Sequence, residues 1–260
     1  MTKAIFFDID GTLVSFRTHE IPQSTVNALT EAKARGLEIY ISTGRPFAII
    51  NNIGPIQHLV DGYVTANGAY CFIGDNVISC SPIATDDVSE LLRLSDSMGF
   101  ACVVVGTSDI ALVNPDEEAH HIFHDLLDVK TLGESAPLEA VLSQPILQMT
   151  PIITAEQERL VLPRLRAVES GRWYPSFADF TARGVSKAKG LRDIAAARGI
   201  DIADTMAFGD GGNDLPILRQ AGIGVAMGNA AAQVKEEADY VTASVDDDGI
   251  ASALRHFALI

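Results

Sequence analysis

Residues 4–13 read AIFFDIDGTL, four apolar residues followed at once by two acids, Asp8 and Asp10, on either side of Ile9. The apolar run is typical of a short buried strand. Two carboxylates this close repel each other, and taking each of them out of water costs several kcal/mol. We therefore expect either a positive partner or a chemical reaction at the end of this strand.

The sequence on both sides of this stretch alternates between predicted strands and predicted helices. The expected strands are residues 37–42, 63–68, 205–210, 223–227 and 240–242, with a hairpin over 69–80 that turns at 74–76. The expected helices are residues 22–35, 186–198, 214–220 and 249–257, with a short one from 230. Apolar strands that alternate with helices indicate a parallel sheet covered on both faces.

The pattern changes between residues 82 and 183. Helical stretches near 85–98, 115–127 and 155–166 alternate there with short β-rich segments. We interpret residues 82–183 as an inserted α/β domain that divides a doubly wound core made of residues 1–81 and 184–260. The predicted fold class is therefore α/β, with a Rossmann-like parallel sheet and an inserted domain.

Composition narrows the class of protein. The chain has 260 residues, 47% of them hydrophobic, which suits one elaborate domain or two smaller ones. Its formal net charge of −15 argues against nucleic acid or an anionic membrane as a partner, since both favour a basic surface. There is no signal-peptide pattern and no apolar run long enough for a membrane span. Three cysteines without metal-binding spacing fit a reducing cytoplasm, and we expect a monomer or a weak homo-oligomer there.

Ligands of open parallel sheets bind outside the carboxyl ends of the strands. This rule brings together the loops that carry Asp8 and Asp10, the triplet Thr43, Gly44 and Arg45, and the segment GDGGND with Asp210, Asn213 and Asp214. The lysine-bearing segment GVSKAKG stands just ahead of the last of these, at the start of a predicted helix. So many carboxylates cannot all stay ionised unless something neutralises them. A divalent cation does this best, and Mg²⁺ typically binds one or two carboxylates together with substrate phosphate and water.

The order of these motifs carries a family resemblance. D-x-D-G-T at 8–12, T-G-R at 43–45, and a lysine followed by G-D-x-x-N-D at 209–214 together resemble the haloacid dehalogenase (HAD) superfamily of phosphotransferases. The insert and the stretches TGRP, ANGAY, GVSK and VAMGNA resemble its Cof-like subfamily IIB, which has a large α/β cap. The resemblance covers the whole chain. It implies a Mg²⁺-dependent phosphomonoester hydrolase for small phosphorylated metabolites, sugar phosphates first, that works through an aspartyl-phosphate.

The resemblance also implies roles for the first motif. Asp8 matches the nucleophile that attacks phosphorus, and it matches a metal ligand. Asp10 matches the acid that protonates the leaving alcohol and then deprotonates the attacking water, and its main-chain carbonyl matches a metal ligand. The main-chain amide of Ile9 matches a phosphate contact.

The T-G-R motif is expected to contact the phosphate. Thr43 matches the phosphate-binding hydroxyl, because the T-G-R frame selects it over its neighbour Ser42. Gly44 belongs to the same phosphate-binding set. Arg45 either reaches the substrate or holds the cap.

The last two motifs complete the implied site. Lys187 matches the amine that neutralises the phosphate, and its distance from GVS favours it over Lys189. Residues two positions apart on a helix point in different directions. Only one of the two amines, Lys187 or Lys189, should therefore face the site. Asp210 matches a metal ligand, and Asn213 matches an amide that contacts phosphate. Asp214 is expected to orient Lys187 or a metal-bound water.

Other residues keep two interpretations. The histidines of the segment HHIFH could bind zinc, or they could lie on a solvent-exposed helix face, which is the simpler interpretation. They are His120, His121 and His124. Arg172, Trp173 and Tyr174 could contact a sugar or pack in the core. Asn67 could touch substrate or shape its turn, and the acids 246–248 are expected to begin the last helix.

Two other functions stay open at this point. A phosphomutase on the same scaffold would pass the phosphoryl group back to a sugar rather than to water. A receiver-like signalling module would also use an aspartate at a strand end with Mg²⁺, but a receiver lacks both the large insert and Asp10.

Overall fold

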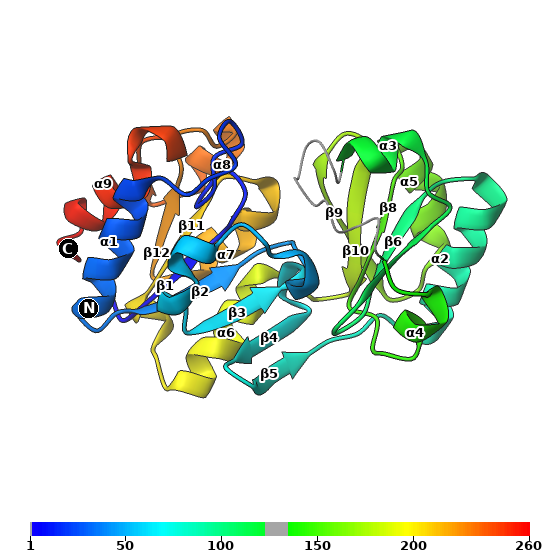
Figure 1. Ribbon diagram of the computed structural model, residues 1–260, viewed down its shortest axis with the longest axis horizontal. Helices are drawn as coiled ribbons and strands as arrows, with labels where there is room; N and C mark the ends of the chain where they lie inside the picture. Colours follow the sequence, from blue (N-terminus) through cyan, green and yellow to red (C-terminus); the bar gives the residue numbers. More distant parts are fainter. Residues whose placement is uncertain (1, 123–134) are drawn as a thin grey trace. The chain divides into compact units, whose positions relative to one another are not determined.

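The computed structural model describes residues 2–122 and 135–260 of the chain (Figure 1). These residues form two compact units. The first contains Met1–Gly44, Asn51–Ser79 and Ser186–Ile260, and the second contains Arg45–Ile50 and Cys80–Val185. The segment Arg45–Ile50, expected from the sequence to belong to the core, groups with the second unit.

Among the described residues, eight strands form one sheet of the first unit, in the order β13-β12-β11-β1-β2-β3-β4-β5. They are β1 Ala4–Phe7, β2 Glu38–Ser42, β3 Gly62–Thr65, β4 Tyr70–Ile73, β5 Asn76–Cys80, β11 Thr205–Gly209, β12 Ile223–Ala226 and β13 Tyr240–Val241. Neighbours from β13 to β3 pair in parallel, and β4 pairs antiparallel with β3. The chain leaves β1 toward β2 on one side and returns to β11 on the other, so the strand order reverses between β1 and β11. The predicted doubly wound α/β fold is confirmed.

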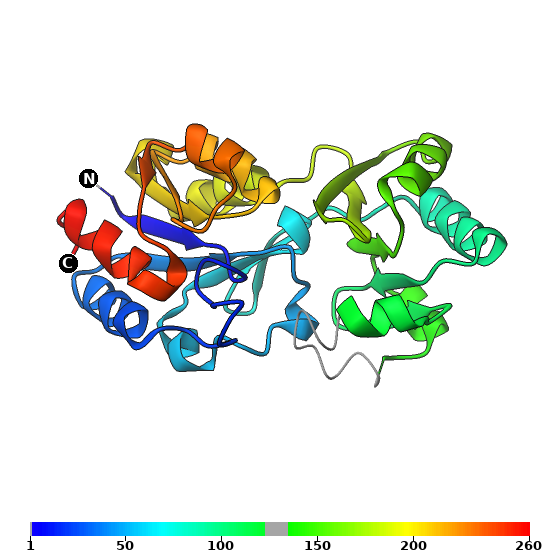
Figure 2. The ribbon, with the colours of Figure 1, turned by 90° about the horizontal axis from the view of Figure 1, so that it is seen from above.

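Helices cover both faces of this sheet (Figure 2). They are α1 Gln23–Ala34, α6 Lys187–Arg198, α7 Leu215–Gln220, α8 Ala232–Glu236 and α9 Gly249–His256, with the 3-10 helices η2 Gly54–Leu59, η3 Ala66–Gly68, η7 Ile202–Asp204, η8 Gly212–Asp214 and η9 Val245–Asp247. The blue α1 and the red α9 lie on one side, and the yellow α6 lies on the other. Leu191 and Ile194 of α6 pack there against Phe6 and Tyr40 of the sheet. Of the described helices, none combines the length and apolar character that a membrane crossing requires.

The strand expected over residues 63–68 is shorter than predicted. It ends at Thr65, because Ala66, Asn67 and Gly68 all have positive φ angles, which strand geometry does not allow. The chain therefore turns sharply just after β3.

The second unit has its own sheet, whose described strands lie in the order β7-β6-β8-β10-β9 with antiparallel pairs. The strands are β6 Cys102–Val105, β7 Ile110–Val113, β8 Gln148–Pro151, β9 Val168–Tyr174 and β10 Phe177–Ala182. The helices are α2 Thr85–Met98, α3 Glu117–His120, α4 Leu138–Leu142 and α5 Ala155–Val161, with η1 Phe47–Ile49 and η6 Leu162–Arg164. The helix expected over 115–127 corresponds to α3, and its residues from 123 onward lie outside the described part of the chain.

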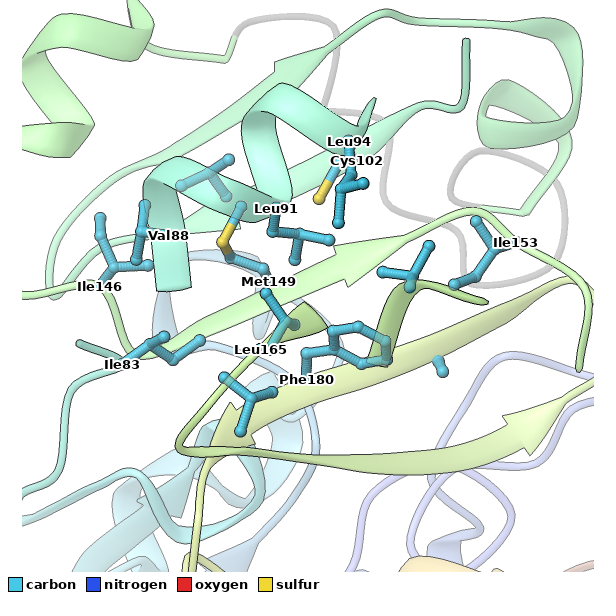
Figure 3. Packing of buried hydrophobic residues seen from close by; sticks show 14 of the residues in the cluster. Ile83, Val88, Leu91, Leu94, Cys102, Ile146, Met149, Ile153, Leu165 and Phe180 are labelled. Atoms are coloured by element: carbon cyan, nitrogen blue, oxygen red, sulfur yellow. The ribbon is translucent and has the colours of Figure 1, made fainter. Parts of the chain in front are cut away.

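Hydrophobic side chains between α2 and this sheet form the core of the second unit (Figure 3). Val88 and Leu91 extend from α2 toward Met149 of β8, and Phe180 of β10 belongs to the same cluster. Cys102 of β6 is completely buried among them. Each unit thus has a hydrophobic core of its own, as a separate domain requires.

Candidate active site

Two acids meet at the carboxyl edge of the parallel sheet. Asp8 follows the last residue of β1, and Asp210 follows the last residue of the neighbouring strand β11. The strands run in parallel and pair Phe7 with Phe208, so their ends lie side by side. The amide of Asp8 donates to the carbonyl of Phe208 at 3.1 Å. Strand pairing therefore brings together two carboxylates from opposite ends of the sequence.

Lys187 supplies positive charge at this edge. It is the first residue of α6, and the hydroxyl of the preceding Ser186 accepts from the amide of Lys189 to cap the helix. Its Nζ donates to Asp8 Oδ1 at 2.7 Å and to Asp214 Oδ1 at 2.6 Å, and its side chain is completely buried. The amine of Lys189 pairs instead with an acid one turn further along α6. Of the two candidate lysines, Lys187 is the one that lies among the acids.

Asp214 binds the lysine and the turn beside it at the same time. Its Oδ1 accepts from Lys187, and its Oδ2 accepts from the amides of Asp210 and Gly211 at 3.0 and 2.9 Å. The residue has no exposed surface. Both of its oxygens therefore accept hydrogen bonds from the protein itself.

The turn after Asp8 holds the carboxylate of Asp210. Thr12 Oγ1 donates to Asp210 Oδ1 at 2.9 Å. Gly11 has a φ of +82°, and a Cβ there would stand 2.2 Å from Asp210 Oδ2, so this position requires glycine for both backbone conformation and space. The side-chain amide of Asn229 donates to the Gly11 carbonyl at 2.8 Å. Thr12 and Asn229 had no role expected from the sequence, although they lie in the motifs D-x-D-G-T and VAMGNA.

Ile9 and Asp10 form the start of the same turn. The carbonyl of Ile9 accepts from the amides of Thr12, Leu13 and Val14, at 3.3, 3.0 and 2.8 Å. These hydrogen bonds form a tight turn immediately after Asp8. Asp10 is half-buried.

Burial and crowding shift the pKa values of the charged groups. Burial raises the pKa of Asp8 well above its ordinary range, and Asp214 adds more to this than Lys187 offsets. Burial, again helped by Asp214, raises the pKa of Asp210 to about 7. Burial alone would lower the pKa of Lys187, but Asp214 and Asp8 outweigh it and raise that pKa, so the amine stays charged. One ammonium faces several carboxylates, and the cluster favours a further positive charge.

The donor atoms of this cluster fit a divalent cation. One carboxylate oxygen from each of Asp8, Asp210 and Asp214 lies within 4.8 Å of the others. Hard cations such as Mg²⁺ prefer such oxygen ligands. Within the described residues, the carboxylate of Asp10 is not part of this group.

The T-G-R segment follows β2, at the same carboxyl edge of the parallel sheet as Asp8 and Asp210. Thr43 is almost fully buried, and its amide donates to a carbonyl of β3 at 2.9 Å. The buried hydroxyl of Ser42 has no hydrogen-bond partner among the described atoms. Gly44 is the last residue of this segment in the first unit. Arg45 opens the stretch that groups with the second unit, and its guanidinium donates to the carbonyl of Ile49 at 3.3 Å.

Asn213 connects the loop after β11 with the loop after β3, both at the carboxyl edge of the sheet. It lies in η8, between Asp210 and Asp214, and its side-chain amide donates to Asn67 Oδ1 at 3.1 Å. Asn67 belongs to η3, directly after β3. The structure thus places Asn67, whose role the sequence left open, in contact with a candidate phosphate ligand.

The candidates of the insert pack within the second unit. Arg172 donates to an acid of α5 and to four main-chain carbonyls, including those of Tyr174 at the end of β9 and Pro175 in the turn that follows. Tyr174 stacks on Phe177, with 5.6 Å between the ring centroids. The side chain of Trp173 lies outside the described part of the structure.

The histidine cluster is described only in part. His120 ends α3 and His121 follows it, whereas His124 lies outside the described residues. In the described ranges, neither His120 nor His121 belongs to a group of possible metal ligands. The zinc interpretation therefore gains no support.

The acidic run 246–248 does not begin the last helix as expected. Helix α9 starts at Gly249, because Asp248 has a φ of 60°, outside helical geometry. Asp246 instead accepts from the side chains of Ser15 and Arg17. Asp246 thereby anchors the segment Ser15–Arg17, which follows the D-x-D-G-T motif.

Comparisons with known proteins agree with this fold. The chain matches the family model of the haloacid dehalogenase-like hydrolases over residues 5–254. It is 50% identical to the solved HAD subclass IIB sugar phosphatase BT4131 over 100% of both chains, with a TM-score of 0.93. It is 34% identical to the solved phosphatase BT1666 from Bacteroides thetaiotaomicron over 100% of this chain and 96% of the other, with a TM-score of 0.89. A Bacillus subtilis (strain 168) protein named "Putative phosphatase YkrA" is 31% identical over 100% of this chain and 99% of its own.

The chain belongs to the haloacid dehalogenase-like hydrolase family. It is an enzyme, a phosphatase of the HAD type, as the order of its motifs predicts.

Proposed function

We propose that this enzyme is a Mg²⁺-dependent phosphomonoester hydrolase for small phosphorylated metabolites, hexose phosphates first, and that it works through an aspartyl-phosphate on Asp8. The observation that carries the proposal is the contact at 2.7 Å between the buried amine of Lys187 and the carboxylate of Asp8. The substrate class is supported by the 50% identity to a solved sugar phosphatase.

Asp8 is the proposed nucleophile. One of its oxygens attacks phosphorus while the bond from phosphorus to the ester oxygen breaks, and Asp10 gives its proton to the leaving alcohol. Water then attacks the phosphorus, its proton returns to Asp10, and the Asp8 carboxylate is released with inorganic phosphate. Lys187 neutralises the negative charge that accumulates beside Asp8 in both steps.

A divalent cation would be held by the carboxylates of Asp8 and Asp210 and by the main-chain carbonyl of Asp10. Both oxygens of Asp214 already accept bonds from the protein, so Asp214 is proposed to orient Lys187 instead. When bound, the cation supplies positive charge for the phosphoryl oxygens and relieves the repulsion among the acids.

The remaining motif residues are proposed to bind the phosphoryl group. They are the hydroxyl of Thr43, the amide of Asn213, the main-chain amide of Ile9 and the neighbouring Gly44. The second unit is proposed as a cap that excludes water and recognises the leaving group, with Arg45 either on the substrate or holding the cap. We further propose a cytoplasmic enzyme that is a monomer or a weak homo-oligomer.

A substrate panel tests this function. Phosphate release is measured with hexose phosphates, nucleotides and phosphorylated cofactors in the presence of Mg²⁺, and products are analysed for isomerised sugar phosphates. We expect hydrolysis, with the highest kcat/KM among hexose phosphates. Isomerisation without phosphate release would favour a phosphomutase, and the absence of both would refute the proposal.

Removal of the metal tests the cofactor. We expect exhaustive chelation to abolish phosphate release, Mg²⁺ to restore it, and Ca²⁺ to inhibit it. Mg²⁺ demands near-octahedral geometry, whereas Ca²⁺ accepts more ligands at looser distances and would disturb in-line attack. Full activity after chelation would contradict the metal requirement.

A further inference from the structure

The loop that follows β3 has an unusual backbone. Ala66, Asn67 and Gly68 have φ angles of 48°, 54° and 98°, so three successive residues lie in the left-handed region. Residues other than glycine and, to a lesser extent, asparagine avoid this region because the Cβ atom crowds the backbone, so the strain lies mainly at Ala66. Such strain persists where the surroundings hold the chain in place, and it often accompanies a functional site.

This loop contacts three segments that are proposed to bind phosphate. The amide of Asn67 donates to the carbonyl of Thr43 at 3.0 Å, and its side-chain oxygen accepts from Asn213 at 3.1 Å. Gly68 lies so close to the carbonyl of Ser186, just before Lys187, that a Cβ would stand 2.2 Å from that oxygen. One strained loop therefore contacts the segments of Thr43, Asn213 and Lys187.

The bond between the two asparagines selects one orientation of the Asn213 amide. An asparagine side chain ends in an oxygen on one side and an NH₂ group on the other, and rotation about χ2 exchanges them at little cost. Asn67 presents its Oδ1 here, which can only accept, and with Asn67 in this orientation the NH₂ group of Asn213 faces it. The NH₂ group has a second N–H, which can donate to an anion, whereas the exchanged orientation would present an oxygen that repels it.

We propose that Asn67 is a positioning residue, which fixes the Asn213 amide with its NH₂ group available to the phosphoryl oxygens. This inference rests on the function proposed above, because it requires Asn213 to contact phosphate. The left-handed backbone is part of the device, since it brings the Asn67 side chain to Asn213 while the main chain remains bonded to Thr43.

The variant Asn67→Gly separates the side chain from the backbone. Glycine adopts positive φ without strain, so the loop should keep its conformation while the carboxamide is lost. We expect binding of inorganic phosphate with Mg²⁺, measured by calorimetry, to weaken about tenfold, the loss typical of one hydrogen bond to a charged group. kcat/KM should fall by a similar factor, while the melting temperature and the Mg²⁺ activation constant stay unchanged. Asn114→Gly is the matched control, because Asn114 also has a positive φ, 48°, but belongs to the second unit.

A double-mutant cycle with Asn213→Ala tests whether Asn67 acts through Asn213. We expect Asn67→Gly to change phosphate binding less than about twofold once Asn213 has been removed, because the two variants delete the same interaction. A full tenfold loss in that background, or wild-type phosphate binding in Asn67→Gly alone, would overturn the positioning role.

Failure of the underlying function would look different. If the wild-type enzyme neither binds inorganic phosphate nor hydrolyses phosphomonoesters, the proposed function fails and the role of Asn67 fails with it. If the wild type does both and Asn67→Gly equals it, only the inference about Asn67 is wrong.

Discussion

Lys187 and its acids illustrate how burial sets the strength of a contact. An exposed ion pair contributes about 0–1 kcal/mol, whereas removing one partner of a buried pair costs about 3–5 kcal/mol, because an unpaired charge is left in a poor solvent. The buried ammonium of Lys187 donates to Asp8 and Asp214 at 2.7 and 2.6 Å. Losing Asp8 would therefore leave Lys187 paired with Asp214, and the fold should survive that change.

The first prediction at this scale concerns Asp8→Asn. An amide has nearly the same shape as a carboxylate but is a poor nucleophile, so we expect turnover to fall by about a thousandfold or more. The stability of the metal-free protein should be equal or higher, because crowding among the carboxylates is relieved. Asp75→Asn, at the exposed β4–β5 turn, is the control. Steady-state kinetics decide the matter, and turnover within tenfold of wild type would exclude Asp8 as the nucleophile.

A second prediction concerns pH and Asp210. Its pKa is raised from 3.8 to about 7 in the folded, metal-free protein, so the folded state holds this proton more tightly than the unfolded state. The resulting stabilisation is complete below about pH 4 and is lost as pH rises through about 7. Asp210→Asn cannot ionise. In chelator, its melting temperature relative to wild type should therefore rise between about pH 4 and pH 7. A difference that does not change with pH would contradict this assignment, and bound Mg²⁺ should reduce the pH dependence of the wild type.

At the scale of elements, the docking of α6 on the sheet determines where Lys187 lies. Gly190, one turn into the helix, faces β3 and β4, and a Cβ there would stand 2.3 Å from Val64 Cγ1 and 3.1 Å from Cys71 Sγ. The missing side chain lets the helix axis approach the sheet. Since Val64 is β-branched and has little rotamer freedom, it cannot easily make room.

Gly190→Ala is predicted to destabilise the enzyme for this reason. Alanine improves helix propensity by about 1 kcal/mol, but overpacking costs about 1–3 kcal/mol, and the contact at 2.3 Å makes overpacking the larger effect. We expect a lower melting temperature and a reduced kcat, because a displaced α6 carries Lys187 with it. Gly54→Ala, where a Cβ meets nothing within 4 Å, is the matched control. The additional change Val64→Ala should restore stability, and a Gly190→Ala variant as stable as wild type would disprove the packing argument.

At the scale of the whole molecule, chemistry and insertion are separated along the chain. The proposed catalytic side chains come from the first unit, namely Asp8, Asp10, Thr43, Lys187, Asp210 and Asp214. The second unit has a sheet and a hydrophobic core of its own. With this division, related enzymes can keep the same phosphoryl chemistry in the first unit while the second unit varies in the leaving group that it recognises.

Excision of the insert tests this division. Replacing residues 82–183 with a short linker should leave a folded core, by circular dichroism, that still hydrolyses an activated aryl phosphate. The reaction should be slower if the insert is the proposed cap, because water would no longer be excluded. The preference among hexose phosphates should disappear. Comparison of kcat/KM across the panel before and after excision decides it. A folded core that keeps the original preference would show that the insert does not determine specificity.

The sequence alone determined the class of fold and predicted the reacting groups that are proposed above. Apolar runs such as 4–7, followed at once by Asp8 and Asp10, are local patterns, and they predict both a buried strand and the acids at its end. The order of the motifs was sufficient for the family, because each motif occupies a few consecutive residues. The insert was visible as a change of pattern, although its boundary missed the segment Arg45–Ile50.

Only the tertiary structure decided how these groups are held. It placed the amine of Lys187 between Asp8 and Asp214, engaged both oxygens of Asp214, and brought Thr12 to Asp210 across 198 residues of sequence. It also bonded Asn67 to Asn213, 146 residues away. A hydrogen bond depends on the distance and direction between two groups in space, and strand pairing sets both for residues that no local pattern connects.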